Sequence, residues 1–445
     1  MAVPPGSRGW ATRARESARL DGPPVDVEIG PDTASDVFHT SGTTGPPKAM
    51  LVTHGDLGFG RGLDKVAAEA FDGGAPIAAP MPLGSAASAG MVAIFALTSP
   101  STIVVCPADD PEEVAATIAR TGAGSLMATP ALVMAMVDLE VWQRHDLSTL
   151  TTIGVASAQL PPRYGRALAQ HLPQAAVLVT YGGGSEAIPA NIRGAYDPAR
   201  PGCVGRPSPG TTLRLVAAGA GEPVALDLPD VAPGEVGRVV LRHEAPLRRF
   251  LDPVNDRGVY VDGWVVTNDL ARLDPEDGLV RVFDRGEDAI PTRGGLLSSL
   301  AVERLLFEHP DVREAAVVAG PGGDDDELIG FVVLRSGSTA TGQDVLAAAA
   351  RYDGAGLLPG RLHLLAELPR GPQGGKVLTR ELRARVAPQA PRSGWRSPLR
   401  GRPSRPARSW PWRRRALVWP VGPGAGRPRS RTAPAPSARP GRGPT

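Results

Sequence analysis

Between residues 36 and 187 short apolar runs alternate with segments of helical periodicity, and this pattern limits the fold more than any other feature. The apolar runs predict strands at residues 37–40, 50–53, 102–106, 125–128, 152–156 and 176–181. Helices are expected at residues 131–139 and 162–172, and a further one after Asp110 as N-cap, with Glu113 placed for a capping box. Strands that alternate with helices pair in parallel, so a parallel sheet covered by helices is expected.

The pattern changes after residue 202. Short strands separated by turns are expected at residues 238–242, 258–267 and 279–283, which indicates antiparallel structure. A smaller unit follows, with helices expected at residues 300–309, 343–352 and 379–386 and strands at 315–319, 328–334 and 361–365. The predicted fold class is therefore α/β: a large N-terminal domain of parallel sheets with a β-rich subdomain, then a small mobile α+β domain. The predicted domain limits are residues 1–285 and 286–388, followed by a disordered Arg/Pro-rich tail at 389–445.

Charge is distributed unevenly along the chain. The net charge is +2, but residues 391–445 contain 14 Arg and no acidic residue, which leaves −12 on residues 1–390. A body of this charge does not favour nucleic acid, so no nucleic-acid partner is expected. Three interpretations of the tail stay open: a basic tether for nucleic acid or anionic membrane, an inert linker, or a wrong reading frame of a GC-rich gene.

Cysteine content and the N-terminal sequence indicate a cytoplasmic protein. Cys106 and Cys203 are the only cysteines, too few for a disulfide framework, and the first residues lack the apolar run of a secretory signal. Residues 73–108 carry no charge, but prolines interrupt them repeatedly. A buried helix and strand are expected there, and no stable membrane insertion.

The segment from residue 40 to residue 48 has the composition of an anion-binding loop. It contains Thr40, Ser41, Gly42, Thr43, Thr44, Gly45 and Lys48. Glycines let the backbone approach a ligand closely, hydroxyl and N–H groups donate hydrogen bonds, and the lysine adds a positive charge. A plain Gly/Thr turn before a strand is the alternative.

Together with later motifs, this loop resembles the phosphate-loop signature of the adenylate-forming (AMP-binding) superfamily, which includes the acyl-CoA synthetases. The later motifs occur in the family's order: Tyr181 to Glu186, Gly263 to Asp269, Asp284-Arg285, Arg293 to Glu303, and Gly374-Gly375-Lys376. The resemblance spans residues 36–386. It implies a reaction in which a carboxylate is joined to the α-phosphate of ATP and pyrophosphate is released.

The resemblance also implies a role for each candidate site residue. Residues 40–48 would bind the β- and γ-phosphates of ATP, Ser185 would donate to the α-phosphate, and Glu186 would hold Mg²⁺. Asp269 would accept the ribose hydroxyls, Arg285 would reach the ribose and phosphate region, and Tyr181 would lie near the adenine. Lys376 would bridge the substrate carboxylate and the α-phosphate. The catalytic residues implied are Lys376, Ser185 and Glu186.

Each of these residues also has an ordinary interpretation. Asp269 could be a turn residue, Arg285 a surface charge, Lys376 a solvated loop lysine and Glu186 an unliganded carboxylate. In relatives the small domain rotates near residues 285–287, and Gly286 is expected to supply backbone freedom there.

The sequence departs from the family pattern at several places. Only 39 residues precede Thr40, so a shortened N-terminus is expected. The segment from Tyr181 to Glu186 is one residue longer than the family's motif, which places Gly182 where an adenine-stacking aromatic is expected. Gly84 and Ser85 replace the usual aromatic and histidine of the acyl-pocket gate, Asn268 replaces a glycine before Asp269, and Ala49 replaces a glycine after Lys48.

The function that the resemblance implies is ATP-dependent activation of a carboxylic acid to an acyl-adenylate, followed by thioester formation with CoA. Two alternatives stay open: an adenylating enzyme that loads a phosphopantetheinyl carrier protein, and an inactive degenerate fragment. The implied cofactors are ATP, Mg²⁺ and CoA.

Overall fold

The computed structural model describes residues 28–40, 48–54, 74–81, 101–107, 110–188, 190–217, 224–225, 227–244, 249–292, 295–320, 328–352, 356–370 and 377–386. The predicted tail at 389–445 and the predicted helical part of residues 82–100 lie outside them. No helix within the described ranges combines the length and apolarity needed to cross a membrane.

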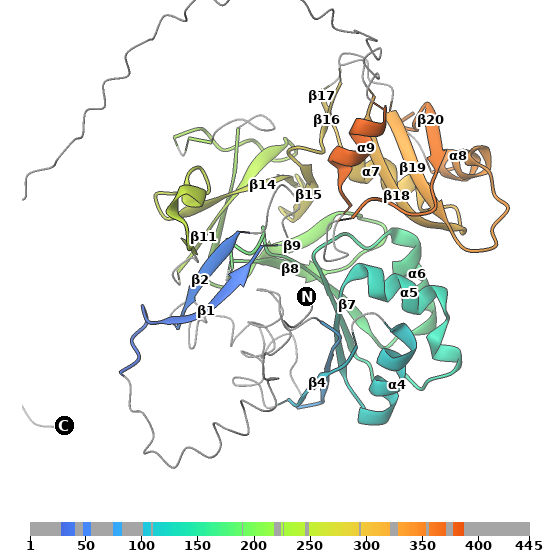
Figure 1. The fold of residues 1–445 in the computed structure, drawn as a ribbon, viewed down its shortest axis with the longest axis horizontal. Coiled ribbons are helices and arrows are strands. Elements are labelled where there is room, and N and C mark those ends of the chain that lie inside the picture. The colour runs from blue at the N-terminus through green and yellow to red at the C-terminus, as the bar shows by residue number, and fades with distance from the viewer. Residues whose placement is uncertain are drawn as a thin grey trace, which may run out of the picture. The chain divides into compact units, whose positions relative to one another are not determined.

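A large mixed sheet forms the centre of the fold (Figure 1). The order of its strands is β10 (Thr211–Val216), β11 (Gly237–His243), β14 (Trp264–Leu273), β15 (Val280–Arg285), β9 (Cys203–Pro207), β8 (Ile192–Ala195), β7 (Ala176–Tyr181), β6 (Thr152–Ala156), β5 (Ser125–Ala128), β3 (Ile77–Ala79) and β4 (Ile103–Val105), while β13 (Tyr260–Val261) pairs with β14. The strands from β4 to β7 pair in parallel, and the pairings from β7 to β10 are antiparallel. The predicted parallel and antiparallel regions are thus both confirmed, and they belong to one continuous sheet.

Helices α4 (Pro111–Thr121), α5 (Pro130–Asp138) and α6 (Pro162–His171) pack against the parallel strands, and the 3₁₀ helix η1 (Val141–Gln143) follows α5. Asp110 caps α4, since its carboxylate accepts from the backbone N–H groups of Glu112 and Glu113, both at 3.1 Å. The predicted capping box is wrong, because the Glu113 carboxylate accepts from the Thr117 hydroxyl at 3.3 Å instead.

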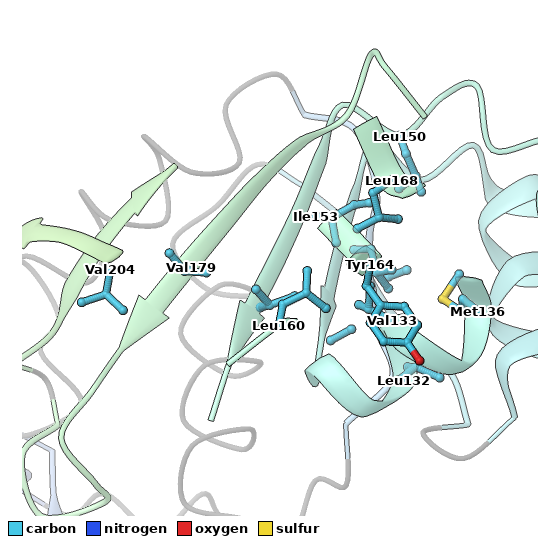
Figure 2. Close-up of a cluster of buried hydrophobic side chains, with 14 of the residues drawn as sticks. Leu132, Val133, Met136, Leu150, Ile153, Leu160, Tyr164, Leu168, Val179 and Val204 are labelled. Carbon is cyan, nitrogen blue, oxygen red and sulfur yellow. The ribbon is translucent and has the colours of Figure 1, made fainter. Parts of the chain in front are cut away.

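An apolar core lies between these helices and the parallel strands (Figure 2). Ile153 of β6 and Tyr164 of α6 are both 1% exposed, and Figure 2 shows them close to Val133 and Leu168. The Tyr164 hydroxyl donates to Asp138 at 3.2 Å, which satisfies the one polar atom of a buried ring. Cys106 and Cys203 are free, as the sequence predicts, and both are buried.

Strands β1 (Ala34–His39) and β2 (Ala49–Thr53) lie outside the large sheet, which corrects the predicted alternating series. They pair antiparallel with each other, and β12 (Arg249–Phe250) adds to β2, with the 3₁₀ helix η2 (Pro253–Asp256) following β12. The physical reason is the short connection between β1 and β2, because a parallel crossover needs a dozen or more residues.

The C-terminal part has its own small sheet. Strands β18 (Val312–Ala319) and β19 (Leu328–Leu334) pair antiparallel, and β20 (Arg361–Leu364) pairs parallel to β19. Helices α7 (Ser299–Leu306) and α8 (Gly342–Ala350) cover one face of this sheet and α9 (Thr379–Val386) covers the other, so both faces are buried. A hairpin of β16 (Ile290–Thr292) and β17 (Gly295–Leu297), which the sequence did not predict, precedes α7.

Candidate functional site

The base of the predicted anion-binding loop is a closed hairpin. The Thr40 N–H donates to the Lys48 carbonyl at 2.9 Å, and the Lys48 N–H donates to the Thr40 hydroxyl at 3.0 Å. These two hydrogen bonds bring both ends of the loop together between β1 and β2. The Lys48 Nζ lies 5.5 Å from the centre of the Phe250 ring. Ser41, Gly42, Thr43, Thr44 and Gly45 lie outside the described residues.

Three predicted site residues meet at the last residues of β7 and β15 and the middle of β14. Asp269 and Arg285 are direct partners in the antiparallel register of β14 and β15. The Tyr181 hydroxyl, from the last residue of β7, donates to Asp269 Oδ2 at 2.7 Å. The Arg285 Nε lies 4.0 Å from the other carboxylate oxygen, Oδ1. The Asp269 carboxylate is therefore held between a phenol and a guanidinium.

The protonation state of Tyr181 follows from this setting. Burial raises its pKa well above 10, and the negative charge of Asp269 raises the pKa further. Tyr181 is therefore a neutral hydrogen-bond donor over the whole physiological pH range.

The glycine-rich segment after Tyr181 turns sharply. Gly183 has φ +64° and Gly184 has φ +119°, in the region that favours glycine. A Cβ on Gly184 would lie 2.8 Å from the Glu186 carboxylate, so the missing side chain leaves the space in which that carboxylate sits. The Tyr260 hydroxyl donates to the Glu186 backbone carbonyl at 3.3 Å. Ser185 stands between Gly184 and Glu186 in the chain, and no atom lies within 4 Å of the position that a Cβ on Gly182 would take.

The described residues contain no group of three or more His, Cys, Asp or Glu side chains that could enclose a metal ion. Glu186 supplies a carboxylate, and carboxylate oxygen is the ligand type that Mg²⁺ prefers, with several waters completing its coordination. The predicted Mg²⁺ site at Glu186 therefore needs only this one protein ligand, and it stays a prediction.

Buried Arg238 of β11 supports the segment after Arg285, a role that no local motif signals. Its guanidinium, in a residue 4% exposed, donates to Asn268 Oδ1 at 2.9 Å. The Asn268 amide donates to Glu287 at 3.2 Å, and the Gly286 N–H donates to the Asn268 carbonyl at 2.7 Å. Gly286 does not have a positive φ, but a Cβ there would lie 3.2 Å from the Asn268 carbonyl and 3.4 Å from Arg238. A side chain at position 286 would therefore be tightly packed, and the predicted backbone freedom of Gly286 stays a prediction.

Asp284 connects β15 to the C-terminal part. Its carboxylate, in a residue 1% exposed, accepts from the Ser299 N–H at 2.6 Å and the Ser299 hydroxyl at 2.9 Å, at the first turn of α7. Burial raises the pKa of Asp284 to about 6. The sequence singles out this residue only as the neighbour of Arg285.

Lys376 lies outside the described residues, together with Arg293 and Gly294. The structure describes the residues that flank it: Arg370 and Val377 form a β-bridge, and the Leu378 N–H donates to the Pro369 carbonyl at 2.8 Å. Helix α9 begins at Thr379. The loop that carries Lys376 thus starts and ends at a fixed base.

A cavity of about 430 Å³ lies at the opposite end of the β14–β15 hairpin. Arg200 on its wall pairs with Asp274 at 2.8 Å and Asp277 at 2.6 Å, and this partner lowers the pKa of Asp277 to about 2. These ion pairs fasten the turn, and none of the predicted site residues lines the cavity.

Comparisons with known proteins agree with the order of the motifs. Residues 4–251 match the family model of the AMP-binding enzyme, and residues 301–375 match that of the AMP-binding enzyme C-terminal domain. A feruloyl-CoA synthase from Amycolatopsis sp is 30% identical over 377 residues, which are 84% of this chain and 74% of that protein. The 4-coumarate–CoA ligase-like 6 protein of Oryza sativa subsp. japonica is 28% identical over 397 residues, 84% of this chain. The match spans only 63% of the rice protein.

Among solved structures, the amide bond synthetase McbA from Marinactinospora thermotolerans superimposes with a TM-score of 0.69 at 25% identity. The match covers 82% of this chain and 72% of that enzyme. The large mixed sheet and the small C-terminal α/β part are thus the architecture that adenylate-forming enzymes share.

Proposed function

Because this chain belongs to the AMP-binding enzyme family, we propose that it activates a carboxylic acid with ATP and transfers the acyl group to coenzyme A. In the first step the carboxylate oxygen attacks the α-phosphorus of ATP, an acyl-adenylate forms, and pyrophosphate leaves. In the second step the CoA thiolate attacks the acyl carbon and AMP leaves. The relatives named as CoA ligases and synthases support this activity.

The observation that carries the proposal is the arrangement of Tyr181, Asp269 and Arg285. A carboxylate whose two oxygens accept hydrogen bonds suits the vicinal diol of a ribose, and Asp269 is held in one orientation by the Tyr181 hydroxyl. The guanidinium of Arg285, 4.0 Å from Asp269, supplies positive charge beside the place of the nucleotide. We assign the ribose to Asp269 and the adjoining phosphate to Arg285.

The remaining roles concern charge, since both reactants are anions. Residues 40–48 bind the β- and γ-phosphates, for which Thr40 and Lys48 stand at the closed base of the loop. Ser185 donates to the α-phosphate, and Glu186 holds the Mg²⁺ that neutralises the phosphates when it is bound. Lys376 donates to the carboxylate and the α-phosphate, where negative charge increases in the transition state.

The substrate class that we propose is an aryl acid, because two of the relatives carry the names of feruloyl- and 4-coumarate-CoA-forming enzymes. A panel of hydroxycinnamic, benzoic and medium-chain aliphatic acids separates the classes when acid-dependent pyrophosphate release is measured with ATP and Mg²⁺. An aryl acid is expected to give the highest kcat/KM, and a preference for aliphatic acids contradicts this assignment.

Two variants test the chemistry itself. Lys376→Ala is expected to lower acid-dependent pyrophosphate release at least a hundredfold, as loss of a transition-state donor does. Asp269→Ala is expected to raise the KM for ATP, while Asp230→Asn, in an exposed ion pair with Arg214, leaves both quantities unchanged. Equal release by the wild type and Lys376→Ala refutes the mechanism.

The thiol acceptor is identified in a second assay. With CoA added, the wild type is expected to form a thioester. An aryl thioester absorbs in the near ultraviolet and co-elutes with an acyl-CoA standard in chromatography. Transfer to a phosphopantetheinyl carrier protein and not to CoA would replace our proposal with carrier loading.

A further inference from the structure

Asp288 lies directly after the segment that joins the large sheet to the C-terminal part, and both donors to its carboxylate come from α9. The Thr379 hydroxyl donates to Asp288 Oδ1 at 2.8 Å, and the Arg383 guanidinium donates to the same oxygen at 2.8 Å. Arg383 also donates to the Glu287 carbonyl at 2.7 Å. The Asp288 side chain is only 15% exposed, so solvent screens this ion pair less than a surface pair.

Asp288 is equally well fixed to the strand that carries Arg285. The backbone N–H groups of Asp288 and Ala289 donate to the Arg285 carbonyl at 3.0 Å and 2.9 Å. Arg285 in turn pairs with Asp269 in the β14–β15 ladder. Asp288 therefore connects α9 to the backbone of the candidate nucleotide site.

Helix α9 begins three residues after Lys376. Its Leu382 side chain is fully buried among residues of β18 and β19, and the bridge between Arg370 and Val377 closes the intervening loop. The residues that follow Lys376 are thus fixed by this bridge and by the start of α9. A side chain that fixes the start of α9 therefore also fixes the residues directly after Lys376.

We propose that Asp288 is a positioning residue: by holding Thr379 and Arg383, its carboxylate fixes the start of α9, three residues after Lys376, relative to Arg285. The part of this proposal that concerns catalysis rests on the proposed function of Lys376. The part that concerns the placement of α9 rests only on hydrogen bonds and can be tested without activity.

The placement is tested by hydrogen exchange of the full-length protein. Asp288→Ala removes the acceptor for both donors, and we expect exchange of the amides of residues 377–382 to become about tenfold faster, as loss of a hydrogen bond to a charged group does. Arg380→Gln is the matched control in the same helix, since Arg380 is exposed and its side chain makes no hydrogen bond or ion pair with the described residues. Unchanged exchange in Asp288→Ala overturns the proposal.

The catalytic part of the proposal is tested by measuring the effect of each variant on kcat and on the KM for ATP separately. ATP would contact residues of the large sheet, so Asp288→Ala and Arg383→Gln are expected to lower the kcat of pyrophosphate release about tenfold and to change the KM for ATP less than twofold. Asp288→Asn keeps an acceptor oxygen for Thr379 and is expected to recover part of the rate. A rise in KM together with a fall in kcat, or the same loss in Arg380→Gln, contradicts a positioning role.

The two failures are distinguishable. If the wild type releases no pyrophosphate with any acid, the proposed function fails, and the exchange experiment still decides whether Asp288 anchors α9. If the wild type is active and Asp288→Ala keeps the wild-type rate and exchange, the proposed function stands and the positioning role is refuted.

Discussion

Replacing Glu303 by glutamine removes an ionisable group from the interior of the C-terminal part. The Glu303 carboxylate on α7 accepts from the Val317 N–H of β18 at 3.0 Å. Burial raises its pKa from 4.5 to about 8; the Val317 N–H opposes this shift, and the negative charges of Asp284 and Asp288 add to it. Glutamine keeps an acceptor oxygen for Val317 and has nearly the same volume, so Glu303→Gln changes little besides the titration.

The size and sign of the effect follow from linkage between protonation and folding. The folded protein binds the Glu303 proton more tightly than the unfolded chain does, because the pKa is raised. The stability that the neutral carboxyl provides is complete below pH 4.5, and it is lost as the pH rises to 8. A difference of 3.5 pH units corresponds to about 5 kcal/mol at 1.36 kcal/mol per unit.

The assay is urea denaturation of the wild type and Glu303→Gln at pH 5, 7 and 9. The free energy of unfolding of Glu303→Gln minus that of the wild type is expected to increase by several kcal/mol between pH 5 and pH 9. Asp284 titrates in both proteins, so its contribution largely cancels in the difference. Glu381→Gln, at an exposed position of α9, serves as the control with no such trend. A difference that stays constant within about 1 kcal/mol refutes the assignment of a buried neutral carboxyl.

Two further predictions concern the segment that begins at Tyr181. Tyr181→Phe removes the donor to Asp269, and the free energy of unfolding is expected to fall by about 1 kcal/mol in urea denaturation; an unchanged value would mean that water replaces the hydroxyl. Gly183→Ala introduces a Cβ 2.9 Å from Leu241 and 3.0 Å from Thr267 at φ +64°. We expect it to cost about 1–3 kcal/mol, seen as a lower Tm, and an unaltered Tm would show that the turn adapts.

Local hydrophobic periodicity is sufficient to predict the position of most helices and strands. The strand β19 and the helix α9 have the limits that the sequence predicts, and β5, β6 and β7 pair in parallel as expected. The prediction was wrong for the pairing of β1 and β2, because an alternation of apolar runs indicates strands but not their partners. The hairpin of β16 and β17 was missed, since strands of three residues are too short for a periodic signal.

In the candidate site, too, residues within short motifs could be predicted from the sequence, and residues that act through distant partners could not. Tyr181, Asp269 and Arg285 were predicted from short motifs, and the structure brings these three together. Arg238 and Asp288 were not predicted as site-supporting residues, because each acts through partners far along the chain. Asp288, for example, contacts a guanidinium 95 residues away, and no local pattern records such a pair.

The two acidic residues after Gly286 face different parts of the molecule. The Glu287 carboxylate accepts from Asn268 on β14, and the Asp288 carboxylate accepts from α9. A change in the orientation of α9 relative to β14 must therefore break at least one of these two sets of hydrogen bonds. The Glu287 side chain is 39% exposed and that of Asp288 15%, so water compensates more readily for the loss of the first set. Of these two side-chain contacts, the one between Glu287 and β14 is therefore the weaker.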